Sequence, residues 1–591
     1  MSHRVERVTR NHSSAGSRWG PALLDAGPPE RARPLEIFAA VVAAVLPVAI
    51  SPAVQSYVFT PKLAVLLVVT AVGMPRLVAL SLRGDHAAPA RAALAFLAVA
   101  LAASLHSPAR LLAFFGSYGW GTGWLFWCAV MGAFAIGASL GDRGRELVAS
   151  GLLVGAGVNA VVEIFQEALR LNSPVVGLYQ GTQADGLMGN PIYLESILIG
   201  ALALTLVRAT RRGATWLALA ALLSAGLELS GERYAVLLLA VLALWALVLV
   251  RSQRAVVFVA SLALGYGLAF ISTSHLLRQR LATSVASNPR TLLWHTLARA
   301  VSHHLLLGFG PGGTLAAETA YQSVTLARRL GVGTYFTDAH DIFIEVTTTT
   351  GLAGISTFLI FAIFALRRAR GPLVGFALLA AAVELVEPLN VGVTPLIFLA
   401  LGASTEQLVQ YRSSGAARME LSTRAVLATL AILVGGTMLF GDADLNAGYV
   451  AFNYGKTERA ARILAVWSQP AIEAGVVATN QSIDAIQPRS LLADARSWYA
   501  VAVRREPQNT QIWSELGSAD IASGHYASAR AAYDHSLALD RFNVDALLGL
   551  GHLDQRLGNQ DRATALFRRA SAIAPHFSEV VQALDSVPAR R

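Results

Sequence analysis

Long apolar runs recur along the first three quarters of the chain, and they constrain its fold more than any other feature. Each is close to the roughly 20 residues that a helix needs to cross the hydrocarbon core of a bilayer, although two runs are short. They lie near residues 35–52, 62–82, 91–105, 121–140, 147–167, 191–208, 214–229, 233–250, 255–273, 341–366, 372–388, 391–408 and 424–440. We therefore predict an all-α, polytopic membrane bundle of about 12–13 transmembrane helices.

Arginine residues between the runs predict how this bundle is oriented. Residues 1–34 are polar and without apolar periodicity, so we expect a disordered cytoplasmic tail rather than a cleaved signal. From this start, alternate connections fall on the cytoplasmic side, and each carries at least two Arg, as the positive-inside rule requires. These connections are 83–91, 141–146, 208–213, 251–254, 367–371 and 411–424. The complementary connections, 53–61, 106–120, 168–190 and 389–390, are poor in Lys and Arg.

The loop at 274–340 is the longest polar interruption of the apolar region, and the same count places it outside the cell membrane. It is rich in Arg and His, which is unusual for a translocated segment and points to binding of an anion, such as a phosphate group. The net charge of +10 does not indicate nucleic acid, because the Arg residues sit in short clusters between apolar runs. A single cysteine, Cys128, excludes an internal disulfide and a cysteine-based metal cluster.

Beyond residue 441 the composition changes to that of a soluble segment, and a repeat of about 34 residues is visible. Five positions recur: Leu516 as Leu550, Gly517 as Gly551, Gly524 as Gly558, Ala529 as Ala563 and Tyr533 as Phe567. This pattern, with a weaker preceding copy at Ala495, Tyr499 and Pro507, resembles the tetratricopeptide repeat. We predict domains at 1–34, 35–441 and 442–591, the last an extracytoplasmic α-solenoid that docks a protein partner or acts as a spacer. The alternative is a helical bundle with accidental periodicity.

Two arginines are candidates for contact with a diphosphate. Arg233 opens an apolar run on the predicted external side, and Arg290 begins an amphipathic segment of the long loop. Guanidinium groups bind phosphate oxygens through two parallel hydrogen bonds, so the pair could hold a diphosphate. The alternatives are a snorkelling anchor or a partner of Glu232 for Arg233, and a purely interfacial role for Arg290.

His340 is the candidate proton acceptor. It lies between Asp338 and Asp341 where the long loop re-enters the membrane, and a neighbouring Asp could fix its tautomer. A structural histidine that caps the following helix is the alternative. His303 and His304 are adjacent without a third ligand at a recognisable spacing, which argues against a metal site. The GFGPGG sequence that follows them is expected to be a tight loop rather than a nucleotide cradle.

Four segments, in this order, resemble the O-antigen ligase and polymerase superfamily of membrane proteins. They are GLMGNPIYLESIL, SGERYAVLLLA, RTLLWHTLARAVSHHLLLGFGPGG and TDAHDIFIEVTTTTGLAGISTFL. The resemblance covers roughly residues 115–405. The chain departs from the pattern at Asp341, where Asn is commoner, and at Trp120, where related sequences often have Arg.

The resemblance implies glycan transfer from a polyprenyl-diphosphate-linked oligosaccharide to an acceptor hydroxyl, with inversion and without a metal or other cofactor. The developing diphosphate charge would be met by Arg233 and Arg290 with help from Arg278 or Arg280, and His340 would deprotonate or orient the acceptor. Asn190 is a further candidate for positioning the carrier, with helix capping as the alternative.

Three functions are left open: a ligase that attaches a finished glycan to lipid or protein, a polymerase that extends it on the carrier, and a transporter of the same lipid-linked glycan. A transporter would carry ionisable positions near mid-membrane, and Glu384 and Glu387 are among the residues that keep it open, although they could also line the substrate cleft. The expected location is the plasma membrane, with the long loop and the repeats outside. No nucleic acid partner is expected.

Overall fold

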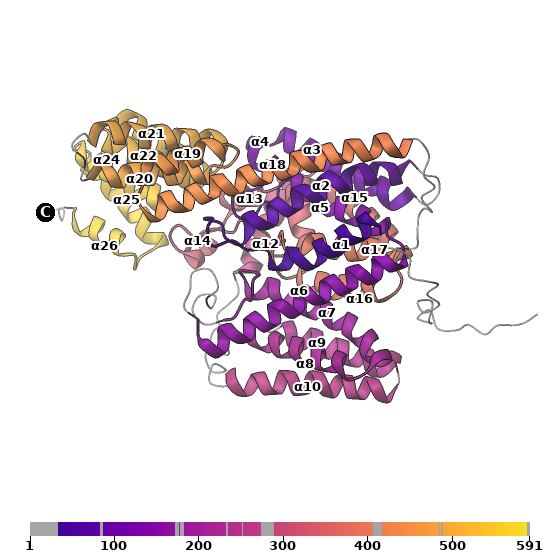
Figure 1. The fold of residues 1–591 in the computed structure, drawn as a ribbon. Helices are drawn as coiled ribbons and strands as arrows, with labels where there is room; N and C mark the ends of the chain where they lie inside the picture. The colour runs from indigo at the N-terminus through magenta and orange to yellow at the C-terminus, as the bar shows by residue number, and fades with distance from the viewer. Residues whose placement is uncertain are drawn as a thin grey trace, which may run out of the picture.

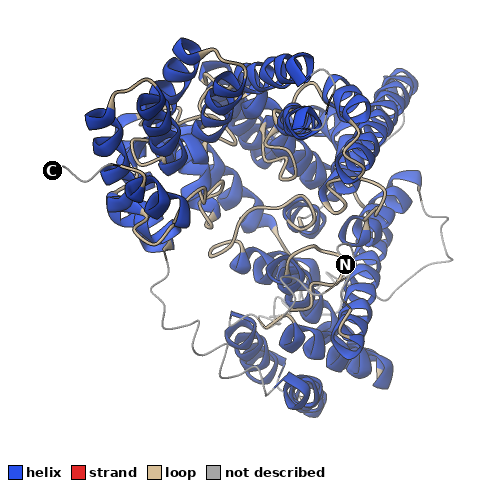
Figure 2. Cartoon of the chain, turned by 90° about the vertical axis from the view of Figure 1, so that its left-hand side faces the viewer, coloured by secondary structure: helices blue, strands red, loops and turns tan. Residues whose placement is uncertain are grey.

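The computed structural model is built of helices joined by loops. It describes residues 33–82, 87–171, 177, 183–231, 234–250, 252–273, 289–405, 416–483, 485 and 488–587. Across these residues there is no β-strand beyond an isolated bridge between Ala369 and Thr405 (Figure 2). The predicted all-α fold is confirmed.

Among the described residues, seven helices are long and apolar enough to cross a membrane. They are α2 Phe59–Ser81, α3 Ala88–His106, α6 Asp142–Leu169, α7 Pro191–Arg212, α10 Gln253–Thr273, α15 Ile342–Arg368 and α18 Ala416–Val450. Shorter apolar helices fill the remaining runs: α1 Pro34–Val45 with η1 Leu46–Val48, α5 Trp124–Ala138, α8 Ala214–Leu229, α9 Tyr234–Trp245 with η3 Ala246–Val250, α16 Pro372–Val383 and α17 Thr394–Ser404. The predicted polytopic membrane bundle is therefore confirmed (Figure 1).

Glycines allow the central helices of the bundle to approach closely. A Cβ atom on Gly137 of α5 would lie 2.2 Å from the carbonyl oxygen of Leu399 on α17, and one on Gly402 would lie 2.1 Å from that of Phe134. Without a hydrophobic driving force between helices in lipid, such close backbone packing is a main source of helix association. A side chain at either glycine would push α5 and α17 apart.

Connections that the sequence predicts on the external side contact one another at one end of the bundle. Lys62, at the start of α2, is buried and donates from its Nζ to the carbonyl oxygens of Ala49 at 3.2 Å and Leu187 at 3.0 Å. A Cβ on Gly310 would lie 2.8 Å from the side chain of Ser107. These contacts join connections far apart in the sequence, as expected if they share a side of the membrane.

Three helices of the long polar loop lie at this end: α12 Arg290–His303, α13 Thr314–Tyr321 and α14 Val324–Leu330. The glycine-rich turn after α12 packs against a break in α15 at Gly351, whose φ of +66° is non-helical. Carbonyls freed by this break accept new donors, because the amides of Phe309 and Gly310 bind Thr348 and Thr349 at 3.0 and 2.8 Å. GFGPGG is thus a backbone clamp on α15.

The C-terminal helices form antiparallel pairs beyond the end of α18. They are α19 Tyr454–Ile463, α20 Gln469–Ile483, α21 Pro488–Arg505, α22 Thr510–Ala522, α23 Tyr526–Leu539, α24 Val544–Arg556, α25 Gln560–Ile573 and α26 Ser578–Asp585. Figure 1 shows them gathered next to α13 and α14. Helices α22 and α24 begin 34 residues apart, as do α23 and α25, which matches the predicted period.

Each repeat closes on itself through an aromatic side chain and a glycine. A Cβ on Gly517 would lie 2.8 Å from the ring of Tyr533, and one on Gly551 would lie 2.3 Å from the ring of Phe567. Tyr499, which stands 34 residues before Tyr533, lies against Gly475 of α20. An ion pair recurs with the same period, as Arg496 with Asp520 and then Arg530 with Asp554.

Helix α18 runs without a break across the predicted domain boundary at 441/442 and ties the repeats to the bundle. Asp442 on this helix accepts hydrogen bonds from the hydroxyl of Tyr118 and from the amide of Ser56, the latter at 3.2 Å. In the first loop of the repeats, the Trp467 indole donates to the carbonyl of Gly116 at 3.1 Å.

Candidate functional site

The candidate site lies where the long polar loop ends and α15 begins. Asp341 is the N-cap of α15, and its side chain accepts from the amides of Phe343 and Ile344, both at 2.8 Å. Asp and Asn cap helices about equally well. The departure from the commoner Asn at this position therefore has a simple structural basis, because either residue performs the same capping role.

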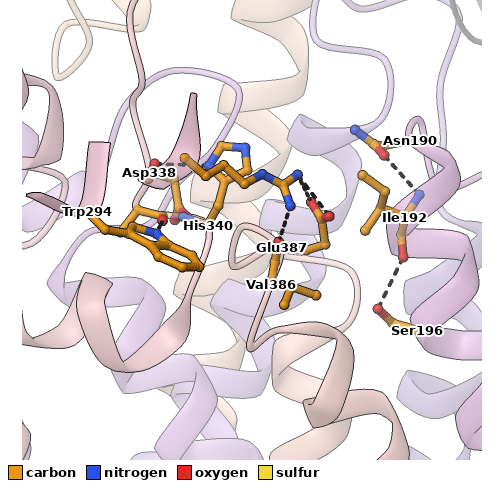
Figure 3. A network of polar contacts seen from close by, with 10 residues as sticks. Asn190, Ile192, Ser196, Trp294, Asp338, His340, Val386 and Glu387 are labelled. Atoms are coloured by element: carbon orange, nitrogen blue, oxygen red, sulfur yellow. Dashed lines mark hydrogen bonds and ion pairs between the residues drawn. The ribbon is translucent and has the colours of Figure 1, made fainter. Parts of the chain in front are cut away.

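His340 precedes the cap with a left-handed backbone, at φ +54°. Its amide donates to the carboxylate of Asp338 at 2.6 Å, and its Nδ1 lies 3.1 Å from the Asp338 carbonyl oxygen (Figure 3). A carbonyl can only accept, so Nδ1 carries the ring proton and Nε2 keeps its lone pair. The backbone of Asp338, rather than its carboxylate, therefore fixes the tautomer.

Burial makes the imidazole of His340 a neutral group. Removal from water is the main cause that lowers its pKa to about 4, and the positive charge of Arg290 lowers it further, while the bond to the Asp338 carbonyl opposes the shift. His340 itself is only partly covered, whereas Asp338 and Ala339 before it are buried. At neutral pH, His340 thus offers an unprotonated nitrogen, as a general base must.

Asp338 and a second carboxylate organise the backbone before His340. Asp338 is buried, and desolvation together with the charge of Glu345 raises its pKa well above the usual range. Glu345 on α15 accepts from the hydroxyl of Thr314 at 2.8 Å and from the amide of Ala339 at 2.9 Å. These bonds connect the start of α13, the loop and α15 around the histidine.

Two aromatic side chains hold the loop from the other side. The indole of Trp294 on α12 donates to the carbonyl of Ala339 at 2.9 Å (Figure 3). The ring of Phe336 meets the imidazole of His340 edge-on, with centroids 5.3 Å apart. The backbone on both sides of the histidine is therefore constrained, as a residue with a strained φ requires.

Arg290 opens α12 and binds a carboxylate rather than pointing at solvent alone. Its NH2 group lies 2.9 and 3.0 Å from the two carboxylate oxygens of Glu387, and its NH1 group donates to the Val386 carbonyl at 2.7 Å (Figure 3). Glu387 is buried. The guanidinium is thus held in a fixed position near the imidazole, whose pKa it influences.

Glu384 belongs to the same segment between α16 and α17. Its carbonyl accepts the amide of Ile342 at 3.0 Å, and its carboxylate accepts from the hydroxyl of Thr394 at 2.5 Å. This connection places the segment that carries Glu387 against the start of α15. The long loop and the segment between α16 and α17, separate in sequence, therefore form one site.

The other predicted residues fall elsewhere or outside the described residues. Asn190 caps α7, because its side chain accepts from the amide of Ile192 at 3.0 Å, and in the view of Figure 3 Glu387 lies between it and His340. Arg233, Arg278 and Arg280 lie outside the described ranges. Trp120 packs with Phe59 and Tyr193.

Sequence reasoning missed several residues of this site. Trp294, Phe336 and Glu345 were not identified, and Glu387 was considered as a residue of a possible transporter or of the substrate cleft, not as a partner of Arg290. Glu345 carries a signal that could have found it, because an ionisable residue near a membrane boundary is costly unless it has a partner. The partnership of Arg290 with Glu387 spans 97 residues of sequence and has no local signature.

In the part of the chain that the structure describes, no group of three or more His, Cys, Asp or Glu is arranged to hold a metal ion. His303 stacks on Tyr321, with ring centroids 5.2 Å apart, and His304 lies against Phe309 at 4.2 Å. The two histidines thus take part in aromatic packing.

Comparison with known proteins bears on the site directly. Residues 197–359 match the O-antigen ligase family, and this range includes α12, α13, α14 and the start of α15 with His340 and Arg290. No curated protein sequence matches the chain.

Several solved structures resemble the chain at low identity. The TPR domain of Arabidopsis OM64 is 20% identical, with 20% of this chain and 96% of that chain covered and a TM-score of 0.17. A thermophilic TPR protein of Thermus thermophilus is 17% identical, with 29% and 92% covered and a TM-score of 0.23. A chain of the Cut9–Hcn1 assembly of APC/C is 12% identical, with 78% and 77% covered and a TM-score of 0.23.

The helix pairs of this chain recur with a period of 34 residues, and this period identifies the C-terminal repeats as tetratricopeptide-type. The matched family supports ligase-like glycan transfer in general, by an enzyme of glycosyltransferase type. The chain is thus a multi-pass membrane protein whose residues 197–359 are similar to the O-antigen ligase family and whose C-terminal helices form an array of tetratricopeptide type.

Proposed function

We propose that this protein transfers a glycan from a polyprenyl-diphosphate-linked oligosaccharide to the hydroxyl of an acceptor, as a ligase. The observation that carries the proposal is His340, held neutral with Nε2 unprotonated, close enough to Arg290 for that charge to affect its pKa. A base and a fixed cation are what this transfer needs. Both residues lie within the range that matches the O-antigen ligase family.

In the proposed step, Nε2 of His340 takes the proton of the acceptor hydroxyl as its oxygen attacks the anomeric carbon. The bond between that carbon and the diphosphate oxygen breaks, and its electron pair leaves with the lipid diphosphate. Attack opposite the leaving group inverts the anomeric centre. The proton remains on the imidazole until it is released to solvent, through the accessible side of the residue.

Arg290 supports this step through its charge. The leaving diphosphate gains negative charge in the transition state, and a preorganised guanidinium stabilises it without reorganisation. Glu387 holds the guanidinium in place until the substrate arrives. We include Arg233, Arg278 and Arg280 as further phosphate contacts. Because arginines supply the positive charge, the proposed step needs no metal ion.

The proposed location of the site is the outer face of the plasma membrane. The Arg-rich connections and the site fall on opposite sides of the bundle by the positive-inside rule. Contacts at this end of the bundle support a shared side, since Lys62 binds Ala49 at the end of the first run and Leu187 in the connection 168–190, while Gly310 packs on Ser107 in the connection 106–120. The repeats that follow α18 share this side.

The test uses purified protein in lipid with a polyprenyl-diphosphate oligosaccharide and candidate lipid or protein acceptors. His340→Asn is the main variant, because Asn tolerates a left-handed backbone better than most residues. Loss of a general base should lower the rate by about 100- to 10,000-fold. Exposed residues on α12 provide matched controls, and His295→Ala and Arg299→Ala should keep nearly all activity. Turnover at the wild-type rate in His340→Asn would overturn the proposal.

The arginine is tested in the same assay. Arg290→Lys keeps the charge and loses the fork that binds two oxygens, so it should retain only part of the activity, while Arg290→Ala should lose more. An incubation without acceptor separates the two enzymatic readings. Longer carrier-linked chains in that incubation would show that the protein is a polymerase rather than a ligase. If neither incubation gives a product, both enzymatic hypotheses are wrong.

A further inference from the structure

The C-terminal repeats contact the loop that leads to His340. The hydroxyl of Tyr335 donates to the carboxylate of Asp540 at 3.2 Å, at the end of α23. The side-chain amide of Gln511 on α22 donates to the carbonyl of Gly333 at 3.0 Å. The guanidinium of Arg328 on α14 donates to the carbonyl of Ala572 on α25, at 2.7 Å. Figure 1 shows the repeats beside the bundle, next to α14.

Apolar packing accompanies these hydrogen bonds. Ala327 of α14 is buried in the core cluster of the repeats, together with Tyr533 and Phe567, and Val332 packs against the same cluster. A loop residue thus contributes to the hydrophobic core of the array. Exposed hydrogen bonds alone contribute little to stability, but shared apolar burial fixes two segments against each other.

Asp540 is the central acceptor of this contact. It is buried, and one carboxylate oxygen accepts the amide of Phe542 at 2.9 Å while the other accepts the hydroxyl of Tyr335. Gln322, between α13 and α14, also hydrogen-bonds this carboxylate. One side chain of the repeats therefore binds two points of the loop.

Glu318 on α13 faces the same carboxylate without forming a hydrogen bond. It is fully buried, and burial together with the charge of Asp540 raises its pKa to about 9. Glu318 is therefore neutral at pH 7 and does not repel Asp540. Glu318 therefore adds no second negative charge beside Asp540 in the contact between the loop and the repeats.

The contact between the loop and the repeats lies only five residues before His340, because Tyr335 takes part in it. Tyr335 is followed by Phe336, whose ring lies edge-on to the imidazole of His340 at 5.3 Å. Displacement of Tyr335 would move Phe336 and with it the surroundings of the histidine. The loop between Gly333 and Asp338 is too short to absorb such a movement without changing the direction of the ring.

We propose that the repeats are docked on the long loop of their own chain and hold His340 in position, so that Tyr335 and Asp540 are positioning residues of the transfer reaction. This inference rests on the proposed function. It assigns the face formed by α22, α23 and α25 to an intramolecular contact. A separate protein partner would have to use another face of the array or displace the loop.

Docking is tested with a disulfide between Gly333→Cys and Gln511→Cys. A Cβ on Gly333 would lie 3.5 Å from the Gln511 amide nitrogen, so a side chain at 333 reaches the end of the Gln511 side chain, although its φ of +67° makes the cysteine there somewhat strained. The only native cysteine, Cys128, is buried and will not compete. The double variant should form an intramolecular bond on mild oxidation and should keep its transfer activity. Absence of the bond, or loss of activity on its formation, would overturn the proposal.

Positioning is tested with Asp540→Asn and Tyr335→Phe. Misplacement of a catalytic group by a fraction of an ångström should lower kcat about 10-fold or more, while KM for the donor stays unchanged. Asp520→Asn is the matched control, because Asp520 is a buried carboxylate of the repeats that pairs with Arg496 inside the array. It should lower stability without changing kcat.

The two tests are then combined. Oxidation of the cysteine pair in the Asp540→Asn background should restore kcat, and reduction should remove the gain, which a general loss of stability would not do. A wild-type kcat in Asp540→Asn, or no recovery on oxidation, would overturn the positioning role. If the double cysteine variant forms the disulfide but neither it nor the wild-type protein transfers glycan, the proposed function fails and the positioning role fails with it, whereas docking stands.

Discussion

At the scale of single residues, His340 combines an unfavourable backbone with a defined chemical state. A left-handed conformation costs a residue with a side chain about 1–2 kcal/mol. The bonds from Asp338 and the contacts of Trp294 and Phe336 maintain it. The strained backbone of His340 thus lowers the stability of the loop, and it fixes the direction of one imidazole nitrogen.

The pKa of His340 predicts an unusual pH dependence of glycan transfer. An ordinary histidine would lose its basic form below about pH 6.5, whereas His340, with a pKa of about 4, should keep the rate level from pH 8 to about pH 5.5. The rate should then fall as the ring takes up a proton. Burial of the neutral ring also stabilises the fold above pH 6.5, and this contribution should disappear as pH falls toward 4.

The measurement is kcat/KM between pH 4 and 8. Asp338→Asn is the control, because its amide oxygen can still accept the His340 amide while it removes the neighbouring titrating carboxyl. Its acid limb should coincide with that of the wild type. An acid limb near pH 6.5 in the wild type would show that the imidazole is solvated as an ordinary histidine.

The capping role of Asp341 predicts that two substitutions at this position differ in their effect on stability. Asp341→Ala removes the acceptor of two amides at the start of α15 and should lower stability by about 1 kcal/mol, whereas Asp341→Asn should be nearly neutral. Thermal unfolding in detergent measures both. Equal losses in the two variants would mean that the charge of Asp341 matters more than its cap.

At this scale, only part of the site could be predicted from the sequence. His340 and Arg290 could be selected because their types and places are unusual in a membrane protein. Their partners could not, because Glu387 and Trp294 reach them through tertiary contacts that depend on how α12, α15 and the segment between α16 and α17 pack. The orientation of the imidazole by a backbone carbonyl likewise leaves no trace in the sequence.

At the scale of elements, the break in α15 is a structural requirement. Gly351→Ala should lower stability by at least about 1–2 kcal/mol, because the residue has φ +66° and its Cβ would lie 2.4 Å from the backbone of Leu306. Gly436→Ala in α18 is the control: no atom lies within 4 Å of its Cβ, and the substitution should be neutral or slightly stabilising. Thermal unfolding in detergent measures the stability of both variants. Equal changes in Tm for the two glycine substitutions would mean that the break in α15 is not required.

Most elements follow from apolar length, since the predicted runs coincide with long or short apolar helices. Their ends were less predictable. The run at 391–408 forms α17 only from Thr394, because the side chain of Asn390 accepts from the amides of Gly392 and Val393 and forms a turn there. Such local capping competes with the helix and is invisible to a hydropathy count.

At the scale of the whole molecule, Asp442 should stabilise the junction between the bundle and the repeats. Asp442→Ala leaves Tyr118 and the amide of Ser56 without their acceptor and should cost about 2 kcal/mol. Asp142→Ala is the control, since Asp142 is 71% exposed in its pair with Arg145 and should contribute less than about 1 kcal/mol. Similar Tm values for the two variants would contradict a structural junction.

The arrangement of the large parts was predictable only in outline. The 34-residue period identified the repeats, because each copy must bury the same aromatic residues against the same glycines. The contact of the repeats with the long loop was not predicted. It depends on Ala327, Tyr335 and Asp540, which are ordinary residues in their own segments.

The recurring ion pair has a consequence for how such a chain can change in length. The pair joins α21 to α22 and then α23 to α24, but the position that would continue it on α25 is Thr564, so a further copy placed after α25 would lack this contact. A copy inserted between α23 and α24 would instead carry Ala572 away from Arg328. An inserted copy would thus lose a contact with the loop, and an added copy would lack the ion pair, so both changes in length carry a structural cost.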